Sequence, residues 1–149
     1  MDDNYYMALA LIEAQKAYDL GEVPIGAVLV IDNQVVASAH NMRETWHDAT
    51  AHAEVIAIRA ACATLQRWRL TGATLYVTIE PCPMCAGALV MSRVDRLVYG
   101  SADYKAGAVE SLYNIVQNPA LNHRMEVTTG VRADECSALM KDFFRQRRK

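Results

Sequence analysis

Apolar residues recur at helical spacing in the first part of the chain. Over residues 5–20, alanines and leucines are interleaved with charged residues; Asn4 stands before them as a possible cap, and Gly21 follows. A helix is typically preceded by a polar cap, carries a periodic apolar face and is followed by a glycine. The pattern therefore predicts an opening helix over residues 5–20.

Two β-rich runs come next. Residues 25–31 read IGAVLVI and residues 34–40 read QVVASAH, with only Asp32 and Asn33 between them. A two-residue link of this kind suits a tight hairpin turn. We therefore expect two paired strands after the helix.

A polar loop over residues 41–50 leads into a second helix, predicted over residues 51–65. Its expected core face recurs at steps of three and four residues, at Val55, Ile58, Cys62 and Leu65. Similar patterns predict strands at 73–79, 96–100 and 125–131, a helix at 83–93 that begins with Pro83, and a terminal helix from about Asp134.

Strands that alternate with helices predict an α/β domain in which helices sandwich a central sheet. The initial hairpin makes that sheet mixed rather than purely parallel. No repeat, linker or low-complexity stretch interrupts the 149 residues, so we expect a single domain over residues 1–149. In such domains ligands bind where loops leave strand ends and helices begin. The segments AHAE and EPCPMC are both predicted at such positions.

The charge of the chain is small but unevenly distributed. A formal net charge of −2 argues against bulk nonspecific binding of nucleic acid, whereas the tail KDFFRQRRK is strongly basic. The N-terminus opens with two acids, unlike a secretory signal, and no apolar run approaches the roughly 18 residues needed to cross a membrane. We expect a cytoplasmic protein with no membrane partner.

Four cysteines in a reducing compartment favour metal binding over a disulfide framework. Cys82 and Cys85 are spaced to face the same side of a helix start, where a thiolate is favoured. His52 and Glu54 stand at the start of another helix, and the chain between them and Cys82 is long enough to form a helix and return through a strand. These residues predict a zinc site.

The number of protein ligands separates a catalytic zinc site from a structural one, because only the catalytic site keeps a position for water. Cys62 lies ten residues after His52 on the same predicted helix, about 15 Å away at ~1.5 Å per residue. Cys136 is expected to be a buried small apolar residue. His47 and His123 remain conceivable fourth ligands.

With three protein ligands, a metal-activated water supplies hydroxide near neutral pH, and Glu54 is placed to carry its proton to a ring nitrogen and then to a leaving amine. A helix-start acid favoured by the macrodipole is the alternative interpretation of Glu54. The ordered set H-A-E and P-C-P-M-C is the pattern of zinc-dependent deaminases.

Over nearly its whole length the chain resembles the bacterial tRNA-specific adenosine deaminases. The matching stretches include GEVPIGAVLV, AHN, TAHAE, ATLYVTIEPCPMCAGA, NHR and DFFRQRR. The resemblance implies a three-layer α-β-α cytidine-deaminase-like fold with a central mixed five-stranded sheet, one Zn²⁺ per subunit and a homodimer. It also implies hydrolytic deamination of adenosine to inosine at the wobble position of an arginine-type tRNA anticodon.

The resemblance assigns roles to individual residues. His52, Cys82 and Cys85 would hold zinc, and Glu54 would shuttle protons. The residues expected to meet the tRNA anticodon stem-loop are Asn41, Ala53, Asp103, Lys105, Asn122, His123, Phe144, Arg145, Arg147 and Arg148. Stacking on aromatic rings and pairing with phosphates are the physical means available to the terminal helix.

Two other functions fit parts of the same sequence. The zinc motif equally permits a deaminase of a free base or nucleoside, such as guanine or cytidine; such an enzyme would hardly need the basic tail. A noncatalytic, zinc-stabilised RNA-binding module would require a fourth protein ligand or the absence of Glu54.

Overall fold

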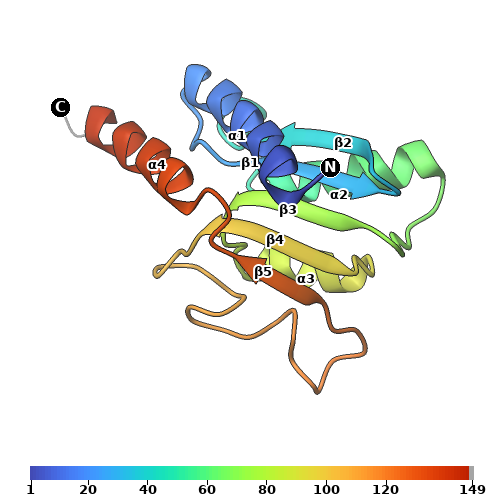
Figure 1. The fold of residues 1–149 in the computed structure, drawn as a ribbon. Helices are drawn as coiled ribbons and strands as arrows, with labels where there is room; N and C mark the ends of the chain where they lie inside the picture. Colours follow the sequence, from blue (N-terminus) through green and yellow to red (C-terminus); the bar gives the residue numbers. More distant parts are fainter. Residues whose placement is uncertain (148–149) are drawn as a thin grey trace.

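The computed structural model describes residues 1–147 and has a five-stranded sheet with the strand order β2-β1-β3-β4-β5 (Figure 1). The strands are β1 (Gly26–Ile31), β2 (Gln34–His40), β3 (Thr74–Ile79), β4 (Arg96–Ser101) and β5 (Glu126–Thr129). Strand β1 is antiparallel to both of its neighbours, whereas β3, β4 and β5 are parallel. The predicted mixed sheet is confirmed.

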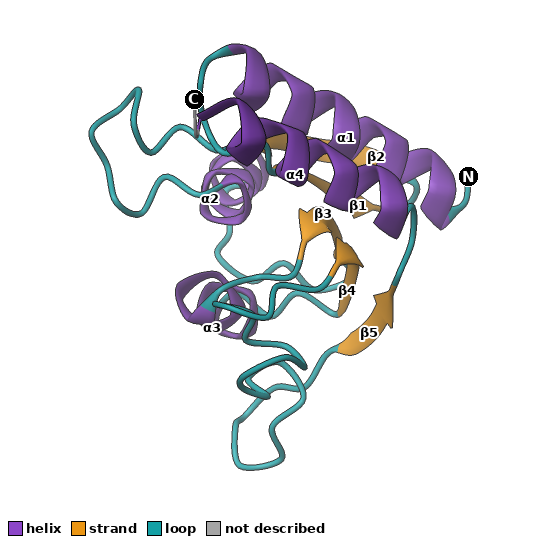
Figure 2. Cartoon of the chain, turned by 90° about the vertical axis from the view of Figure 1, so that its left-hand side faces the viewer, coloured by secondary structure: helices purple, strands orange, loops and turns teal. Residues whose placement is uncertain are grey.

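Helices cover both faces of the sheet, as Figures 1 and 2 show. Helices α1 (Asp3–Asp19) and α4 (Ala133–Arg147) lie on one face, and α2 (Ala53–Leu65) and α3 (Pro83–Met91) on the other. Each face has its own apolar core, formed on the α1 side by Met7 and Val28 and on the α2–α3 side by Leu75 and Leu89, among others. The chain therefore has the predicted three-layer α/β architecture. No helix within residues 1–147 is long and apolar enough to cross a membrane.

Helix α1 packs directly against β1 because Gly26 has no side chain. A Cβ atom at this position would lie 2.0 Å from the carbonyl oxygen of Ala10 and 2.5 Å from the amide nitrogen of Ala14. The helix begins earlier than predicted, since Asp2 rather than Asn4 caps it by accepting a hydrogen bond from the Tyr5 amide at 2.9 Å. Either residue can cap a helix, and their closeness in sequence made the choice ambiguous.

The link between β1 and β2 is the predicted tight turn. Asp32 and Asn33 both have positive φ, at 50° and 60°, which is the backbone geometry of the two-residue turns that join twisted strands. Aspartate and asparagine tolerate this geometry better than most residues.

The buried face of α2 differs from the prediction. It consists mainly of small residues, with Ala53, Ala57 and Ala61 fully buried beside Ile58, whereas Val55 is only partly buried. Cys62 and Leu65 do pack against the core, as expected. Alanines let a helix approach a sheet closely. The buried face of α2 is therefore marked by small side chains rather than by the largest apolar residues.

The carboxyl ends of β2, β3 and β4 meet at one edge of the sheet. His40 is paired with Gly26, Ala27 with Val77, and Ile79 with Ser101. The loops that leave these strands therefore emerge side by side, next to the start of α3. This edge carries the candidate site.

Candidate metal and catalytic site

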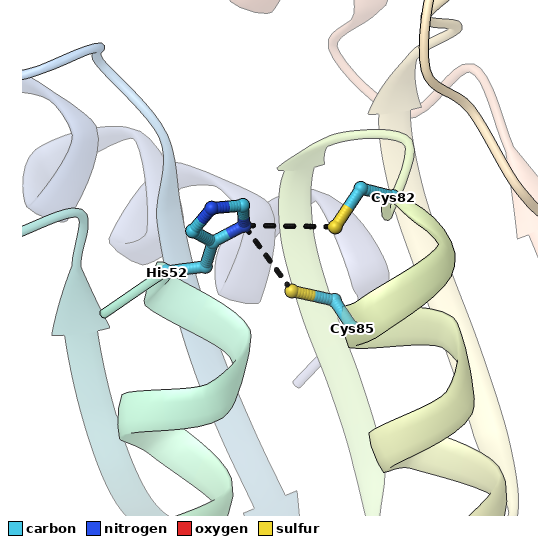
Figure 3. Close-up of side chains that lie close together, drawn as sticks. All are labelled: His52, Cys82 and Cys85. Carbon is cyan, nitrogen blue, oxygen red and sulfur yellow. Dashed lines mark hydrogen bonds between the residues drawn. The ribbon is translucent and has the colours of Figure 1, made fainter. Parts of the chain in front are cut away.

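Three potential metal ligands converge where α2 and α3 begin. The Nδ1 atom of His52 lies 3.6 Å from the Sγ atom of Cys82 and 3.5 Å from that of Cys85 (Figure 3). All the ligand atoms of this group lie within 4.8 Å of one another. The sequence predicts this trio, and the structure brings it together.

The local structure explains why these side chains face each other. His52 and Cys82 are the N-cap residues of α2 and α3, each with an extended backbone, and Pro83 begins α3 where its missing N–H breaks no helical hydrogen bond. Cys85 follows one turn later and is fully buried. Two helix N-termini thus point their partial positive charge toward the same thiols.

The thiols are polarised by their neighbours. A hydrogen bond from Cys85, assisted by His52, lowers the pKa of Cys82 to about 4. The hydrogen bond to Cys82 in turn raises the pKa of His52, and the thiol of Cys85, which serves as the donor, has a raised pKa. Cys82 is therefore the more readily ionised of the two cysteines, and an imidazole with two cysteine sulfurs is a donor set that suits zinc.

Glu54 lies just inside α2, one residue beyond its first position. Its side chain is buried, and burial raises its pKa to about 7. Within residues 1–147 its Oε1 atom has no hydrogen-bond partner. A buried polar atom without a partner is costly and calls for an explanation, which a bound water or ion beside His52 would supply.

No fourth protein ligand joins the trio among the described residues. The Sγ atom of Cys62 lies 3.6 Å from the Trp68 carbonyl oxygen, and Cys136 is buried on the α1 side of the sheet, as a small apolar residue would be. His47 is exposed, and the Nε2 atom of His123 is 2.6 Å from the Val94 carbonyl oxygen. The described residues therefore offer three protein ligands, the number found in catalytic zinc sites, rather than the four of structural ones.

Four residues predicted to meet the substrate line one groove. Asp103 and Lys105, from the loop after β4, face Phe144 and Arg145 of α4 across a cavity of about 760 Å³. The apolar lining includes Val23, Ile25 and Ile79, and the residues that prediction missed include Tyr104, Met140 and Lys141. The Tyr104 side chain is 81% exposed and that of Phe144 42% exposed. The groove therefore combines accessible aromatic rings with the cations of Lys105, Lys141 and Arg145.

Two predicted contacts are placed at the site edge but are buried. Asn41 follows β2, where its Nδ2 donates to the Val23 carbonyl at 3.5 Å and its Oδ1 accepts from the Arg43 amide at 3.3 Å. Ala53 is fully buried at the start of α2.

Other predicted contacts lie outside the groove. Asn122 and His123 precede β5, and the hydrogen bond between His123 and Val94 holds them at the sheet edge opposite the metal ligands. The Arg147 guanidinium stacks 4.5 Å from the Phe143 ring and donates to the Gly21 carbonyl. Arg148 lies outside the described residues.

Two buried glutamates at the site edge were not predicted from the sequence. Glu22 accepts hydrogen bonds from the Glu44 amide at 3.1 Å and from both the amide and hydroxyl of Thr45 at 2.6 Å. Burial opposes ionisation of Glu80, but hydrogen bonds from Glu110, Ser111 and Asp103 outweigh it and lower the Glu80 pKa to about 2. The one sequence signal is an acid followed within two residues by a proline, which is too common to identify such a role.

Comparison with known proteins finds relatives along nearly the whole chain. The MafB19-like deaminase family profile matches residues 1–148. The tRNA-specific adenosine deaminase of Bacillus subtilis is 53% identical over 147 residues, covering 99% of this chain and 91% of the relative. That of Haemophilus influenzae is 48% identical, covering 98% of this chain and 85% of the relative.

Solved structures agree with these relatives. One, from work on A-to-I editing by tRNA deaminases at the wobble position of transfer RNA, is 47% identical with a TM-score of 0.88, covering 91% of this chain and 98% of that one. A guanine deaminase from Nitrosomonas europaea is 24% identical with a TM-score of 0.77, covering 94% and 83%, which shows a common fold alone. Matched along nearly its whole length by both sequence and structure, the chain belongs to the MafB19-like deaminases and, among them, to the tRNA-specific adenosine deaminases.

Proposed function

We propose that this protein hydrolyses adenosine to inosine at the wobble position of a tRNA anticodon and uses zinc to do so. The observation that carries the chemistry is the convergence of His52, Cys82 and Cys85 beside the buried, unpartnered oxygen of Glu54. The tRNA-specific relatives, identical at about half of their positions, support the choice of substrate.

His52 Nδ1 and the Sγ atoms of Cys82 and Cys85 would hold one Zn²⁺ per subunit. A zinc ion bound there supplies Lewis-acid activation of water near neutral pH. The start of α2 and the start of α3 favour the negative charge of the sulfurs, and the burial of Cys85 keeps solvent from one side of the group. The protein thereby holds the donor atoms in place before binding.

Glu54 moves the protons of the reaction. Its carboxylate takes a proton from the attacking water and delivers it to the adenine ring nitrogen, where it remains. A second transfer moves the proton of the hydroxyl newly bonded to C6 to the amine, which leaves as ammonia while the hydroxyl oxygen becomes the carbonyl oxygen of inosine. A pKa near 7 suits both directions of transfer at neutral pH, because the group then accepts and releases a proton with little bias.

The groove between the loop after β4 and α4 suits single-stranded RNA. Bases of an anticodon loop can be turned outward at low cost, stack on rings such as Tyr104 and Phe144, and leave their phosphates near Lys105 and Arg145. We assign Asn41 and Ala53 to the wall near the reacting base, and Asn122, His123, Arg147 and Arg148 remain predicted contacts with the rest of the stem-loop.

The decisive test replaces Glu54 with glutamine, which keeps the shape of the side chain and removes its proton-carrying function. Inosine formation in an arginine tRNA anticodon stem-loop should fall roughly 10²–10⁴-fold, while zinc content stays at the wild-type level. The exposed Glu126→Gln is the matched control and should keep full activity. Normal turnover by Glu54→Gln would remove Glu54 from the mechanism.

Free adenosine, cytidine and guanine belong in the same assay. If the protein deaminates one of these and leaves the stem-loop unmodified, the proposed zinc chemistry would stand, but the substrate would be a free base or nucleoside rather than RNA.

We further propose that residues 1–149 act as one deaminase unit in the cytoplasm and that two such chains form a homodimer. The outer side of α2 supports this, because Val55 and Ile56 line a groove of about 500 Å³ together with Trp46, whose side chain is 53% exposed. Sedimentation equilibrium should return twice the chain mass, and Val55→Asp should shift the protein toward monomer. A wild-type protein of single-chain mass at micromolar concentration would contradict the dimer.

A further inference from the structure

Glu80 lies between the end of β3 and Cys82, the N-cap residue of α3, and is only 3% exposed. No lysine, arginine or histidine among residues 1–147 forms an ion pair with it. A buried carboxylate with no cation beside it must obtain its stabilisation from hydrogen-bond donors. The identity of those donors indicates what Glu80 does.

All of the donors come from one segment, residues 101–111, here called the 101–111 loop. The Oε1 atom accepts from the Asp103 amide at 3.0 Å and from the Ser111 hydroxyl. The Oε2 atom accepts from the amides of Val109, Glu110 and Ser111 at 3.1, 2.9 and 3.0 Å. The carboxylate therefore joins both ends of the loop at a single point.

The backbone around Glu80 and the shape of the loop strengthen this attachment. The Pro81 carbonyl accepts from the Ala108 amide at 2.8 Å, and the Glu80 amide donates to the Ser101 carbonyl at 2.9 Å. Gly107 leaves room for the carboxylate, since a Cβ atom there would lie 2.4 Å from Glu80 Cδ. The loop is closed around the Glu80 side chain.

The 101–111 loop carries one wall of the groove. Asp103 Oδ1 accepts from the amides of Lys105 and Ala106 at 3.0 and 3.2 Å, which forms a turn that leaves Tyr104 exposed toward solvent. Asp103, Tyr104 and Lys105 all line the groove. Because Glu80 is two residues from Cys82, it links this wall directly to the metal ligands.

We propose that Glu80 is a positioning residue that fixes the 101–111 loop at a set distance from the metal ligands, so that the nucleotides flanking the reacting adenosine are held in register with the site. This inference rests on the proposed function. Glu80 itself touches no substrate and acts through the loop residues Asp103 to Lys105. Hydrogen bonds to an ionised carboxylate are about twice as strong as neutral ones, so its loss releases several loop amides together.

The test is Glu80→Gln, which keeps the volume of the side chain but removes its charge and replaces one acceptor oxygen by an NH₂ donor that faces other donors. We expect the KM for the anticodon stem-loop to rise roughly tenfold while kcat stays within about threefold of the wild-type value, because binding of the RNA is weakened equally in the ground state and the transition state. Hydrogen exchange should quicken at the amides of Asp103 and of residues 109–111, while zinc content stays unchanged.

Glu110→Gln is the matched control in the same loop. It also removes a charge, but its Oε1 can still accept from the Tyr99 hydroxyl, which lies 2.9 Å away. Wild-type KM and wild-type loop exchange are expected for this variant.

Two results would overturn the inference. One is a Glu80→Gln protein with wild-type KM and unchanged exchange in the 101–111 loop. The other is a joint loss of kcat, zinc and thermal stability, which would make Glu80 a general structural residue. If the wild-type protein leaves the stem-loop unmodified, the proposed function fails, and the role of Glu80 fails with it. If the wild-type protein forms inosine and Glu80→Gln has the same KM and the same loop exchange, only the positioning role is rejected.

Discussion

Cys85 is the most deeply buried of the three proposed zinc ligands, whereas His52 and Cys82 are each partly accessible. A serine at this position keeps the size of the side chain but offers a hydroxyl that does not ionise near neutral pH. We therefore expect Cys85→Ser to lose most of its zinc, as measured by elemental analysis after gel filtration, and to lose deaminase activity with it.

Cys62→Ser provides the comparison for that variant. The Cys62 thiol lies in the last turns of α2, near the Trp68 carbonyl rather than near His52. The zinc content of Cys62→Ser should therefore equal that of the wild type. A Cys85→Ser protein that retains its full zinc content would mean that the ion is held elsewhere.

Individual residues differ in how far the sequence predicts their roles. The sequence predicts that His52, Glu54, Cys82 and Cys85 lie at one site, because few residue types bind zinc or carry protons and because their positions at two helix starts are a local property. Glu22 and Glu80 were missed because their partners are mostly backbone amides, which every residue except proline possesses. Hydrogen bonds to backbone amides do not depend on the residue type of the donor, so they can be identified only once the fold is known.

Among the secondary-structure elements, the close packing of α1 on β1 gives a sharp test. A Cβ atom at Gly26 would overlap backbone atoms of Ala10 and Ala14, which cannot move without displacing the helix. Gly26→Ala should therefore lower the free energy of unfolding by about 3 kcal/mol or more, at the upper end of the effects of overpacking. Urea denaturation monitored by circular dichroism measures this change.

Gly87→Ala is the control for that substitution. Gly87 lies inside α3, and among residues 1–147 no atom beyond its chain neighbours and the backbone of its own helix lies within 4 Å of the position of the added methyl group, so alanine adds only its better helix propensity. A gain of about 0.5–1 kcal/mol is expected. Equal effects of the two substitutions would show that α1 is not seated on β1 as described.

The elements themselves were largely predictable because their signals are local. Apolar periodicity, the Asp32–Asn33 turn and Pro83 gave strand and helix limits close to those observed, including β2 over Gln34–His40. The face of α2 was predicted less well, because alanines carry little hydrophobic signal although they make up most of its buried residues. Pairing between distant strands and the attachment of loops are tertiary properties that no local signal contains.

At the scale of the whole molecule, Asp3 connects the first helix to the sheet. Arg96 donates to both of its oxygens at 2.9 and 2.7 Å, and the Tyr76 hydroxyl donates at 2.8 Å. The hydrogen bonds from Arg96 lower the pKa of Asp3 below its ordinary value. The interaction joins α1 to β3 and β4.

A lowered carboxyl pKa fixes the sign of the pH dependence. The ionised form is favoured in the folded protein, so Asp3 contributes its full stabilisation above about pH 4, and this is lost as pH falls through the folded-state pKa. At pH 7, Asp3→Asn should be about 1 kcal/mol less stable than wild type, and the difference should shrink as pH falls through the folded-state pKa of Asp3.

Urea titrations at pH 7, 4 and 2.5 would measure this difference, with the exposed turn residue Asp32→Asn as the control. A wild-type advantage over Asp3→Asn that grows on acidification would contradict the assigned ion pair.

The contact between Gly107 and Glu80 also bears on how this enzyme can diverge. A methyl group at position 107 would lie 2.4 Å from Glu80 Cδ and 2.5 Å from the Asp103 carbonyl oxygen, so it would overlap both the carboxylate and the backbone of the loop. Shortening the acid to aspartate would not make room for alanine, because the Asp103 carbonyl accepts a hydrogen bond from the Gly107 amide at 2.8 Å and cannot withdraw without opening that turn. Lineages drifting toward new substrates, and combinatorial libraries aimed at the same goal, are therefore expected to keep glycine at position 107 and to vary exposed side chains of the loop such as Tyr104.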